Sequence, residues 1–297
     1  MNLGRLVTKN HVYEIRKITA DGFLLFNVGT GMEFESPLSR ALMTPFTVMT
    51  DDESVKEHVN PHPNITVTPM DLSADLQTTR VFPLSFSSIN TFETCPRQFQ
   101  HLYVLKDVKN EGNEATLWGS KVHKEIEDYI NLSKEMTEPV AKKAIPYVEL
   151  GKEKYRLVEW KWGLTKDFEP CDFFSKDVAY RGVIDFAFFP SDDKVVVMDW
   201  KTGKRKDAWD QLDIFALSVF VNFPQVQKVR TMFVWLKTDE KPTMKDYTRG
   251  DMDALKVGLQ EKADPIYQRL EYGEFPVKPS GLCRGWCPVK SCSEYKA

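Results

Sequence analysis

The sequence predicts an α/β fold preceded by a small β-rich module, and three patterns carry this prediction. Residues 180–206 contain two runs of β-branched and aromatic residues around a short polar turn, which is typical of a β-hairpin. Apolar residues recur at helical spacing over 118–132 and again over 207–220. Residues 1–50 alternate polar and apolar positions around a turn signal, as short strands do.

The chain divides by composition into a small and a large part. With 297 residues, of which 42% are hydrophobic, it can form one large domain and one small one. We expect residues 1–55 to form the β-rich module and residues 81–297 to form the main domain. Residues 56–80 are expected to be a linker, because they are polar and carry prolines without a sustained period. His58 and His62 fall in this linker, where solvated side chains are a simpler interpretation than a metal site.

Further elements are expected on both sides of the hairpin. Residues 140–160 predict a long charged helix, with a kink or break at Pro146. Residues 229–236 predict another strand beside the hairpin, to which residues 245–249 pair. Residues 251–272 predict one last helix.

The hairpin brings two acidic residues together. If its turn is centred on Asp192, antiparallel pairing puts Pro190 opposite Lys194. Counting back along both strands then puts Asp185 directly opposite Asp199. Like charges in an otherwise apolar sheet destabilise it, so this pair requires a compensating positive charge.

Lys201 completes the cluster, because side chains alternate along a strand and Lys201 shares a face with Asp199. Such a cluster suits phosphodiester hydrolysis. Hard carboxylate oxygens hold Mg²⁺ or Mn²⁺, and an ammonium group stabilises the charge that builds on the phosphate. The plain alternative is a surface hairpin on which Asp199 and Lys201 are only solvated.

This cluster resembles the motif of the PD-(D/E)XK nucleases, and specifically that of their RecB-like branch. There, a Gly-x-x-Asp strand precedes an Asp-x-Lys-Thr-Gly strand, as Asp185 precedes the run Asp199-Trp200-Lys201 here. The resemblance covers about residues 80–297. It implies a restriction-endonuclease-like core, a central mixed sheet flanked by helices. It also implies that Asp185, Asp199 and the Trp200 carbonyl bind a metal ion, and that Lys201 assists the attacking hydroxide.

Three further positions match this branch. His123 lies where the family has a helix-borne metal-binding histidine, although a histidine beside an apolar stripe is more often a core or boundary residue. Gln211 lies where the family has Gln-x-x-x-Tyr on the helix after the lysine strand, and it is expected to anchor the Asp199 strand or to touch substrate. Phe215 replaces the tyrosine of that pattern. Residues 85–103 are similar to the first helix of the family.

Four of the five cysteines indicate a metal centre. Cys283, Cys287 and Cys292 lie in one short loop that contains glycine and proline, and Cys95 is the candidate for a fourth ligand. In RecB-like members such as AddB-type subunits and CRISPR-associated nucleases, one cysteine before the core joins three after it around a [4Fe-4S] cluster. The resemblance implies that the same kind of cluster links Cys95 to the C-terminal cysteines here. Zn²⁺ is the main alternative, and four unrelated cysteines are a third. Cys171 has no nearby cysteine and is expected to be a buried thiol.

The net charge of −3 gives no overall basic footprint, and this counts against nucleic-acid binding. A local patch of Lys204, Arg205 and Lys206 is the expected contact to DNA. Arg97 is expected either to meet a phosphate or to be an ordinary surface arginine. The sequence contains no Gly-x-x-x-x-Gly-Lys-Ser/Thr phosphate loop, so a motor role is not expected.

These features predict a Mg²⁺- or Mn²⁺-dependent deoxyribonuclease, and the resemblance favours an exonuclease that acts on DNA ends in recombination, repair or viral DNA metabolism. One alternative is an endonuclease of the same fold. Another is a non-catalytic DNA-binding or recruitment subunit whose N-terminal module engages a recombination or replication protein. The N-terminus lacks the apolar core of a signal peptide, and no apolar run is long enough to cross a bilayer. We therefore expect no membrane association and a location in the cytoplasm, that of the host if the protein is viral.

Overall fold

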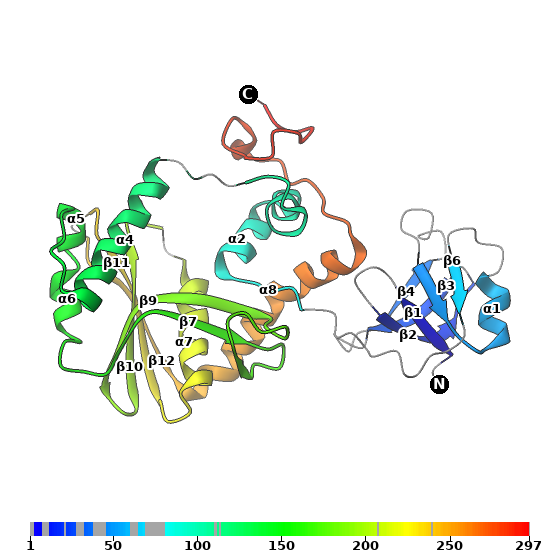
Figure 1. Cartoon of the computed structure of the whole chain (residues 1–297), viewed down its shortest axis with the longest axis horizontal. Helices are drawn as coiled ribbons and strands as arrows, with labels where there is room; N and C mark the ends of the chain where they lie inside the picture. The colour runs from blue at the N-terminus through cyan, green and yellow to red at the C-terminus, as the bar shows by residue number, and fades with distance from the viewer. Residues whose placement is uncertain are drawn as a thin grey trace. The chain divides into compact units, whose positions relative to one another are not determined.

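The computed structural model describes residues 3–7, 12–20, 22–27, 33–37, 46–59, 65–68, 81–109, 112, 114–206, 208–238 and 240–296. The chain forms two compact units, Met1–Val81 and Phe82–Ala297. In Figure 1, unit 1 is drawn in shades of blue and unit 2 in cyan to red.

Unit 1 is built on a six-stranded mixed sheet with the strand order β4-β3-β2-β1-β5-β6. Neighbouring strands are antiparallel except β5 and β6, which are parallel. The helix α1 (Glu53–Val59) packs Val55 and Val59 into a core with Ile15 and Phe23 of the sheet. The strands are β1 (Gly4–Val7), β2 (Val12–Ile18), β3 (Gly22–Asn27), β4 (Glu33–Pro37), β5 (Phe46–Met49) and β6 (Ile65–Thr68).

The expectation that residues 56–80 form a linker is wrong for part of that range. The end of α1 and the strand β6 belong to unit 1, because Val59 is buried in its core and β6 pairs with β5. His58 is not a solvated linker side chain either. Its Nε2 lies 3.1 Å from the Gly22 carbonyl oxygen, and its ring packs edge-on against Phe23. His62 lies outside the described residues.

Unit 2 contains a second six-stranded mixed sheet, with the strand order β12-β11-β10-β9-β7-β8. β10 and β11 are parallel, whereas the other neighbours are antiparallel. The expected α/β class with a central mixed sheet is confirmed. The strands are β7 (Arg156–Leu164), β8 (Pro170–Cys171), β9 (Tyr180–Ser191), β10 (Lys194–Lys201), β11 (Lys228–Trp235) and β12 (Thr243–Thr248).

Helices cover this sheet. α4 (Glu114–Leu132), α5 (Pro139–Lys142) and α6 (Ile145–Glu149) lie together beside the sheet and share one core with Phe186 and Trp200 (Figure 1). α7 (Trp209–Asn222) contacts the sheet as well as α8 (Met252–Tyr272), which explains why most of its residues are buried. The remaining helices are α2 (Phe86–Thr94), α3 (Pro96–Phe99), the π-helix Gln100–Leu105 and the 3₁₀-helices Arg249–Asp251 and Gly281–Cys283.

Residues 140–160 do not form one helix. Prolines open the first turns of both α5 and α6, each of which ends after one turn, and from Arg156 the chain is a strand. The strand forms because the bulky residues of 156–164 pair along β9, with Trp160 opposite Ile184.

The expected pairing of Pro190 with Lys194 is also wrong. Ser191 pairs with Lys194, so the turn consists of Asp192 and Asp193 alone. An irregularity between Lys194 and Val196 then restores the expected register further along the hairpin.

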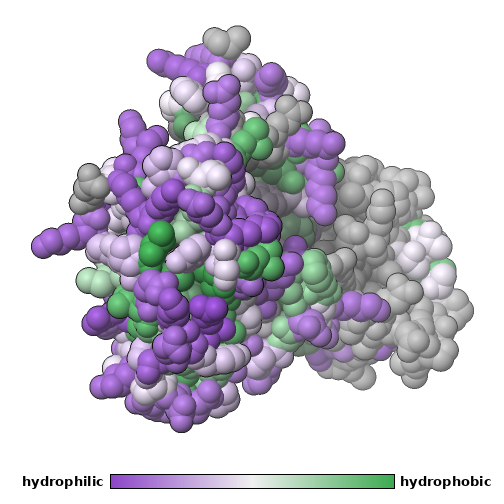
Figure 2. Space-filling model, turned by 60° about the vertical axis from the view of Figure 1, so that its left-hand side comes forward, coloured by the Kyte–Doolittle hydropathy of each residue, from purple (hydrophilic) through white to green (hydrophobic). Residues whose placement is uncertain are grey.

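In the coloured part of Figure 2, hydrophilic side chains cover much of the surface, and hydrophobic ones appear between them. The large apolar residues fill the interior instead: Val122, Phe186 and Trp200 are at most 2% exposed. None of the described helices is long and apolar enough to cross a membrane.

Candidate active site

The two hairpin aspartates lie where β9 and β10 stop pairing. The ladder ends at Met198 opposite Phe186, so its register would next bring Asp199 opposite Asp185. Instead of a main-chain bond, the Trp200 amide donates a hydrogen bond to Asp185 Oδ2 at 2.8 Å. Asp185 and Asp199 are only 9% and 6% exposed. Burial and the charge of Asp185 raise the pKa of Asp199, against the opposing effect of Lys201.

Lys201 and Gln211 form a closed triangle with Asp199. Gln211, in the first turn of α7, donates from Nε2 to Asp199 Oδ1 at 3.0 Å and accepts from Lys201 Nζ at 2.9 Å. Lys201 Nζ also lies 2.7 Å from Asp199 Oδ2. This short ion pair compensates part of the charge of the buried carboxylate.

His123 extends the site from helix α4. The apolar stripe of Val122 and Ile126 fixes this helix in the core, which directs His123 toward the sheet. Its Nδ1 lies 3.4 Å from Asp185 Oδ2. Burial alone would lower the pKa of His123, but the hydrogen bond to Asp185 and the surrounding negative charges raise it to about 9. A cation that binds at this ring nitrogen must therefore displace a proton.

Glu159 of β7 is a member of the site that the sequence did not predict. One ligand atom each from Glu159, His123 and Asp185 lie within 4.8 Å of one another. Burial, followed by the charge of Asp185, raises the pKa of Glu159 to about 7. Within the described ranges this is the only group of three His, Cys, Asp or Glu residues so closely spaced. A signal was present, since Glu159 is a single acid between apolar residues of a strand, but it required 156–164 to be recognised as a strand.

These side chains open into a polar cleft of about 710 Å³, a volume usual for a ligand site. One wall of the cleft is α4, which approaches the end of β10 closely at Gly119. A Cβ atom on Gly119 would lie 2.8 Å from Thr202 Oγ1, so a larger residue at this position requires the Thr202 side chain to move. The chemically active residues that line the cleft are His123, Glu159, Asp199 and Lys201.

Comparison with known proteins decides the family. The model of the PD-(D/E)XK nuclease superfamily matches residues 83–162 and 133–292 of this sequence. The chain belongs to the PD-(D/E)XK nuclease superfamily. The PD-(D/E)XK nucleases use divalent metal ions and act on DNA, and the match lies within unit 2. No curated protein sequence matches the chain.

Two solved structures align with most of this chain. One is the crystal structure of SSO0001, with 10% sequence identity and a TM-score of 0.40 over 73% of this chain and 88% of that chain. The other is a "putative exonuclease" from Eubacterium rectale, with 14% identity and a TM-score of 0.43 over 75% of this chain and 92% of that chain.

The residues of this PD-(D/E)XK site fit a divalent cation. Two carboxylates and one imidazole converge at His123, Glu159 and Asp185, and Asp199 presents a further buried carboxylate beside Lys201. Carboxylate oxygens are the ligands of Mg²⁺ and Mn²⁺ in proteins, and imidazole is compatible with Mn²⁺.

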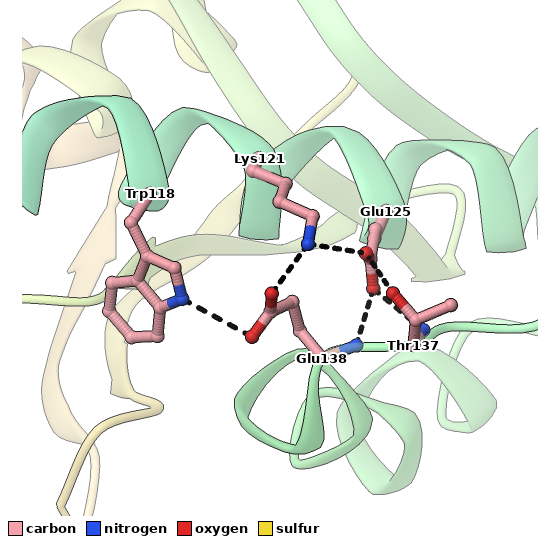
Figure 3. A network of polar contacts seen from close by, with 5 residues as sticks. All are labelled: Trp118, Lys121, Glu125, Thr137 and Glu138. Carbon is pink, nitrogen blue, oxygen red and sulfur yellow. Dashed lines mark hydrogen bonds and ion pairs between the residues drawn. The ribbon is translucent and has the colours of Figure 1, made fainter. Parts of the chain in front are cut away.

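A polar network fixes α4 against the start of α5 (Figure 3). Glu138 accepts hydrogen bonds from Trp118 Nε1 at 3.2 Å and from Lys121 Nζ at 2.6 Å. Glu125 accepts from the backbone amides of Thr137 and Glu138, both at 2.8 Å. These bonds hold the helix that positions His123.

The structure separates the residues expected to contact DNA. Lys204, Arg205 and Lys206 are exposed and follow the cleft residues Thr202 and Gly203, and Arg205 forms an ion pair of 3.2 Å with Glu240. The described contacts of Arg97 are with another part of unit 2. Its Nε donates to the Phe275 carbonyl at 3.0 Å, and it lines the cavity formed by the cysteines. Arg97 therefore anchors the chain after α8.

Four cysteines line one small cavity of about 20 Å³. Cys95, between α2 and α3, meets Cys283, Cys287 and Cys292 of the C-terminal segment there. Burial raises the pKa of the Cys287 thiol, and the three neighbouring thiols add to the rise. Cys171 is in β8 and does not line this cavity.

Proposed function

We propose that the protein is a Mg²⁺- or Mn²⁺-dependent deoxyribonuclease of the RecB-like branch that acts as an exonuclease on DNA ends. The observation that carries this proposal is the Asp199–Lys201–Gln211 triangle beside Asp185 and His123 in an open polar cleft. These residues place an ammonium group and metal-ligating oxygens in the same cleft.

Each side chain has a distinct part in this proposal. Asp185, Asp199 and His123 would hold the cation, with the Trp200 carbonyl as a further ligand. When bound, such a cation neutralises phosphate charge and lowers the pKa of water. Lys201 donates hydrogen bonds toward the attacked phosphate, and Gln211 positions both Lys201 and Asp199.

Contacts to the DNA backbone would come from the exposed residues Lys204, Arg205 and Lys206 at the end of the cleft. Unit 1 lies outside the family match and is the part that would engage a recombination or replication protein.

The decisive experiment compares end-labelled linear DNA with covalently closed DNA, with and without Mn²⁺. We expect the wild type to digest linear DNA alone, and Asp199→Asn to lower the rate by at least about 100-fold, because it removes a charge from the reacting centre. Asp210→Asn is the matched control, since this half-exposed carboxylate of α7 pairs with Lys262 at 2.8 Å. Cleavage of closed DNA would indicate an endonuclease, and no cleavage by the wild type would leave a DNA-binding subunit.

We further propose that Cys95, Cys283, Cys287 and Cys292 bind a [4Fe-4S] cluster, with Zn²⁺ as the alternative. The shared cavity supports a metal centre. Within the described chain, no three of these sulfurs lie within 4.8 Å of one another. Tetrahedral zinc with Zn–S bonds of about 2.3 Å would hold its sulfurs about 3.8 Å apart, so zinc would require these sulfurs to move closer together.

A further inference from the structure

Glu159 has an unusual backbone for a residue within a strand. Its φ of 48° lies in the left-handed region, which L-residues other than Asn, Asp and Gly avoid. The neighbouring pairs Val158–Phe186 and Trp160–Ile184 keep one register, so the distortion is confined to Glu159. The local turn of the backbone coincides with the position where the Glu159 carboxylate meets His123 and Asp185.

The Glu159 carboxylate is compensated in charge only in part, by His123, which also pairs with Asp185. It is half-buried, and in the described part of the chain no hydrogen bond or ion pair engages it. Lys201 is already committed to Asp199, and His123 to Asp185. A partly buried carboxylate whose charge is only partly compensated is costly, and a cation at the meeting point of the three side chains would remove this cost.

We propose that Glu159 is a direct ligand of the catalytic cation, together with His123 and Asp185. The inference rests on the proposed function, because it adds a ligand to the same centre. Asp185 would then bind the cation together with Glu159 on one side and with Asp199 on the other. Because one of the three ligand atoms is an imidazole nitrogen, the centre should bind Mn²⁺ more tightly than Mg²⁺.

The backbone of Glu159 offers a way to separate ligation from folding. Asparagine accepts a left-handed conformation more readily than glutamate and carries no charge. If Glu159 had only a structural role, Glu159→Asn would change the melting temperature and leave the Kd for Mn²⁺ unchanged. If Glu159 is a ligand, the metal-free variant should be at least as stable as the wild type and should bind Mn²⁺ poorly.

The test measures Mn²⁺ binding to the full-length protein by the electron paramagnetic resonance signal of free Mn²⁺, and thermal melting in EDTA. We expect Glu159→Gln and Glu159→Asn to raise the Kd for Mn²⁺ by at least about tenfold. Glu127→Gln is the matched control. This glutamate lines the same cleft but pairs with Lys124 at 3.0 Å, so its removal should leave the Kd unchanged.

The outcomes distinguish the inference from the proposed function. If both Glu159 variants bind Mn²⁺ within twofold of the wild type while Asp185→Asn binds weakly, Glu159 is not a ligand and the metal-dependent nuclease stands. If the wild type neither binds Mn²⁺ nor cleaves DNA, both are overturned. Loss of Mn²⁺ binding in Glu159→Asn with unchanged melting in EDTA supports the inference, and equal loss in Glu127→Gln overturns it.

Discussion

His123 and Glu159 retain protons over a pH range in which their unfolded counterparts lose them. The pKa of His123 rises from 6.5 to about 9, and that of Glu159 rises from 4.5 to about 7. For both groups the folded state binds more protons than the unfolded state within these windows. Their contribution to stability is therefore present below the lower value and is lost as the pH rises through the higher one.

The raised pKa of His123 predicts that the metal-free protein loses stability as the pH rises from 6.5 to about 9. Thermal melting in EDTA across this range should show a falling Tm, and the fall should be shallower in His123→Gln. His101→Gln is the control, because His101 pairs with the exposed Asp107 away from the cleft. An identical pH slope in wild type and His123→Gln would contradict the prediction.

At the residue scale, sequence reasoning found the side chains whose positions depend on local pairing. The hairpin register over Val196–Met198 results from the two-residue turn together with the irregularity between Lys194 and Val196, and it carries Asp185 and Asp199 with it. Glu159 was not predicted, because its position depends on the pairing of β7 with β9, which are separated in the sequence. It also depends on a left-handed backbone conformation that the local sequence does not indicate.

At the element scale, α4 depends on its network with the start of α5. One oxygen of Glu125, Oε2, accepts both the Thr137 and the Glu138 amides, and Oε1 accepts the Thr137 hydroxyl. Glu125→Gln removes the negative charge and one of these two acceptors. We expect a loss of about 1 kcal/mol in the free energy of unfolding, which urea titration would measure, and a lower rate of DNA cleavage as His123 loses its fixed position. Glu127→Gln should change neither value. Unchanged urea stability of Glu125→Gln would argue against this function of the network.

Helices with a sustained apolar stripe were predictable, as α4, α7 and α8 show. Residues 140–160 were not, because their charged composition is compatible with a helix. Pro139 and Pro146 each begin a separate short helix, and the strand that follows is stabilised by pairing to β9. Strand β6 was missed for a related reason, since its parallel partner β5 lies across α1 in the sequence.

At the scale of the whole molecule, the cysteine cavity joins residues before the sheet to residues after it. A metal centre there would close a long loop of chain and couple metal binding to folding. We expect Cys287→Ser to lose bound metal and to melt at a lower temperature, whereas Cys171→Ser should retain both. Elemental analysis and the visible absorption spectrum would measure the metal, and one zinc per chain without colour would replace the iron–sulfur assignment. Full metal content and an unchanged Tm in Cys287→Ser would refute the centre.

The end of pairing between β9 and β10 has a practical consequence. The Asp185 side chain accepts the hydrogen bond of the buried Trp200 amide. Asp185→Ala would leave this donor without an acceptor, whereas the side-chain oxygen of Asp185→Asn can still accept the bond. Asp185→Asn should therefore yield a well-folded but inert protein. Such a protein is the natural bait for capturing uncut DNA in a crystal or on a column.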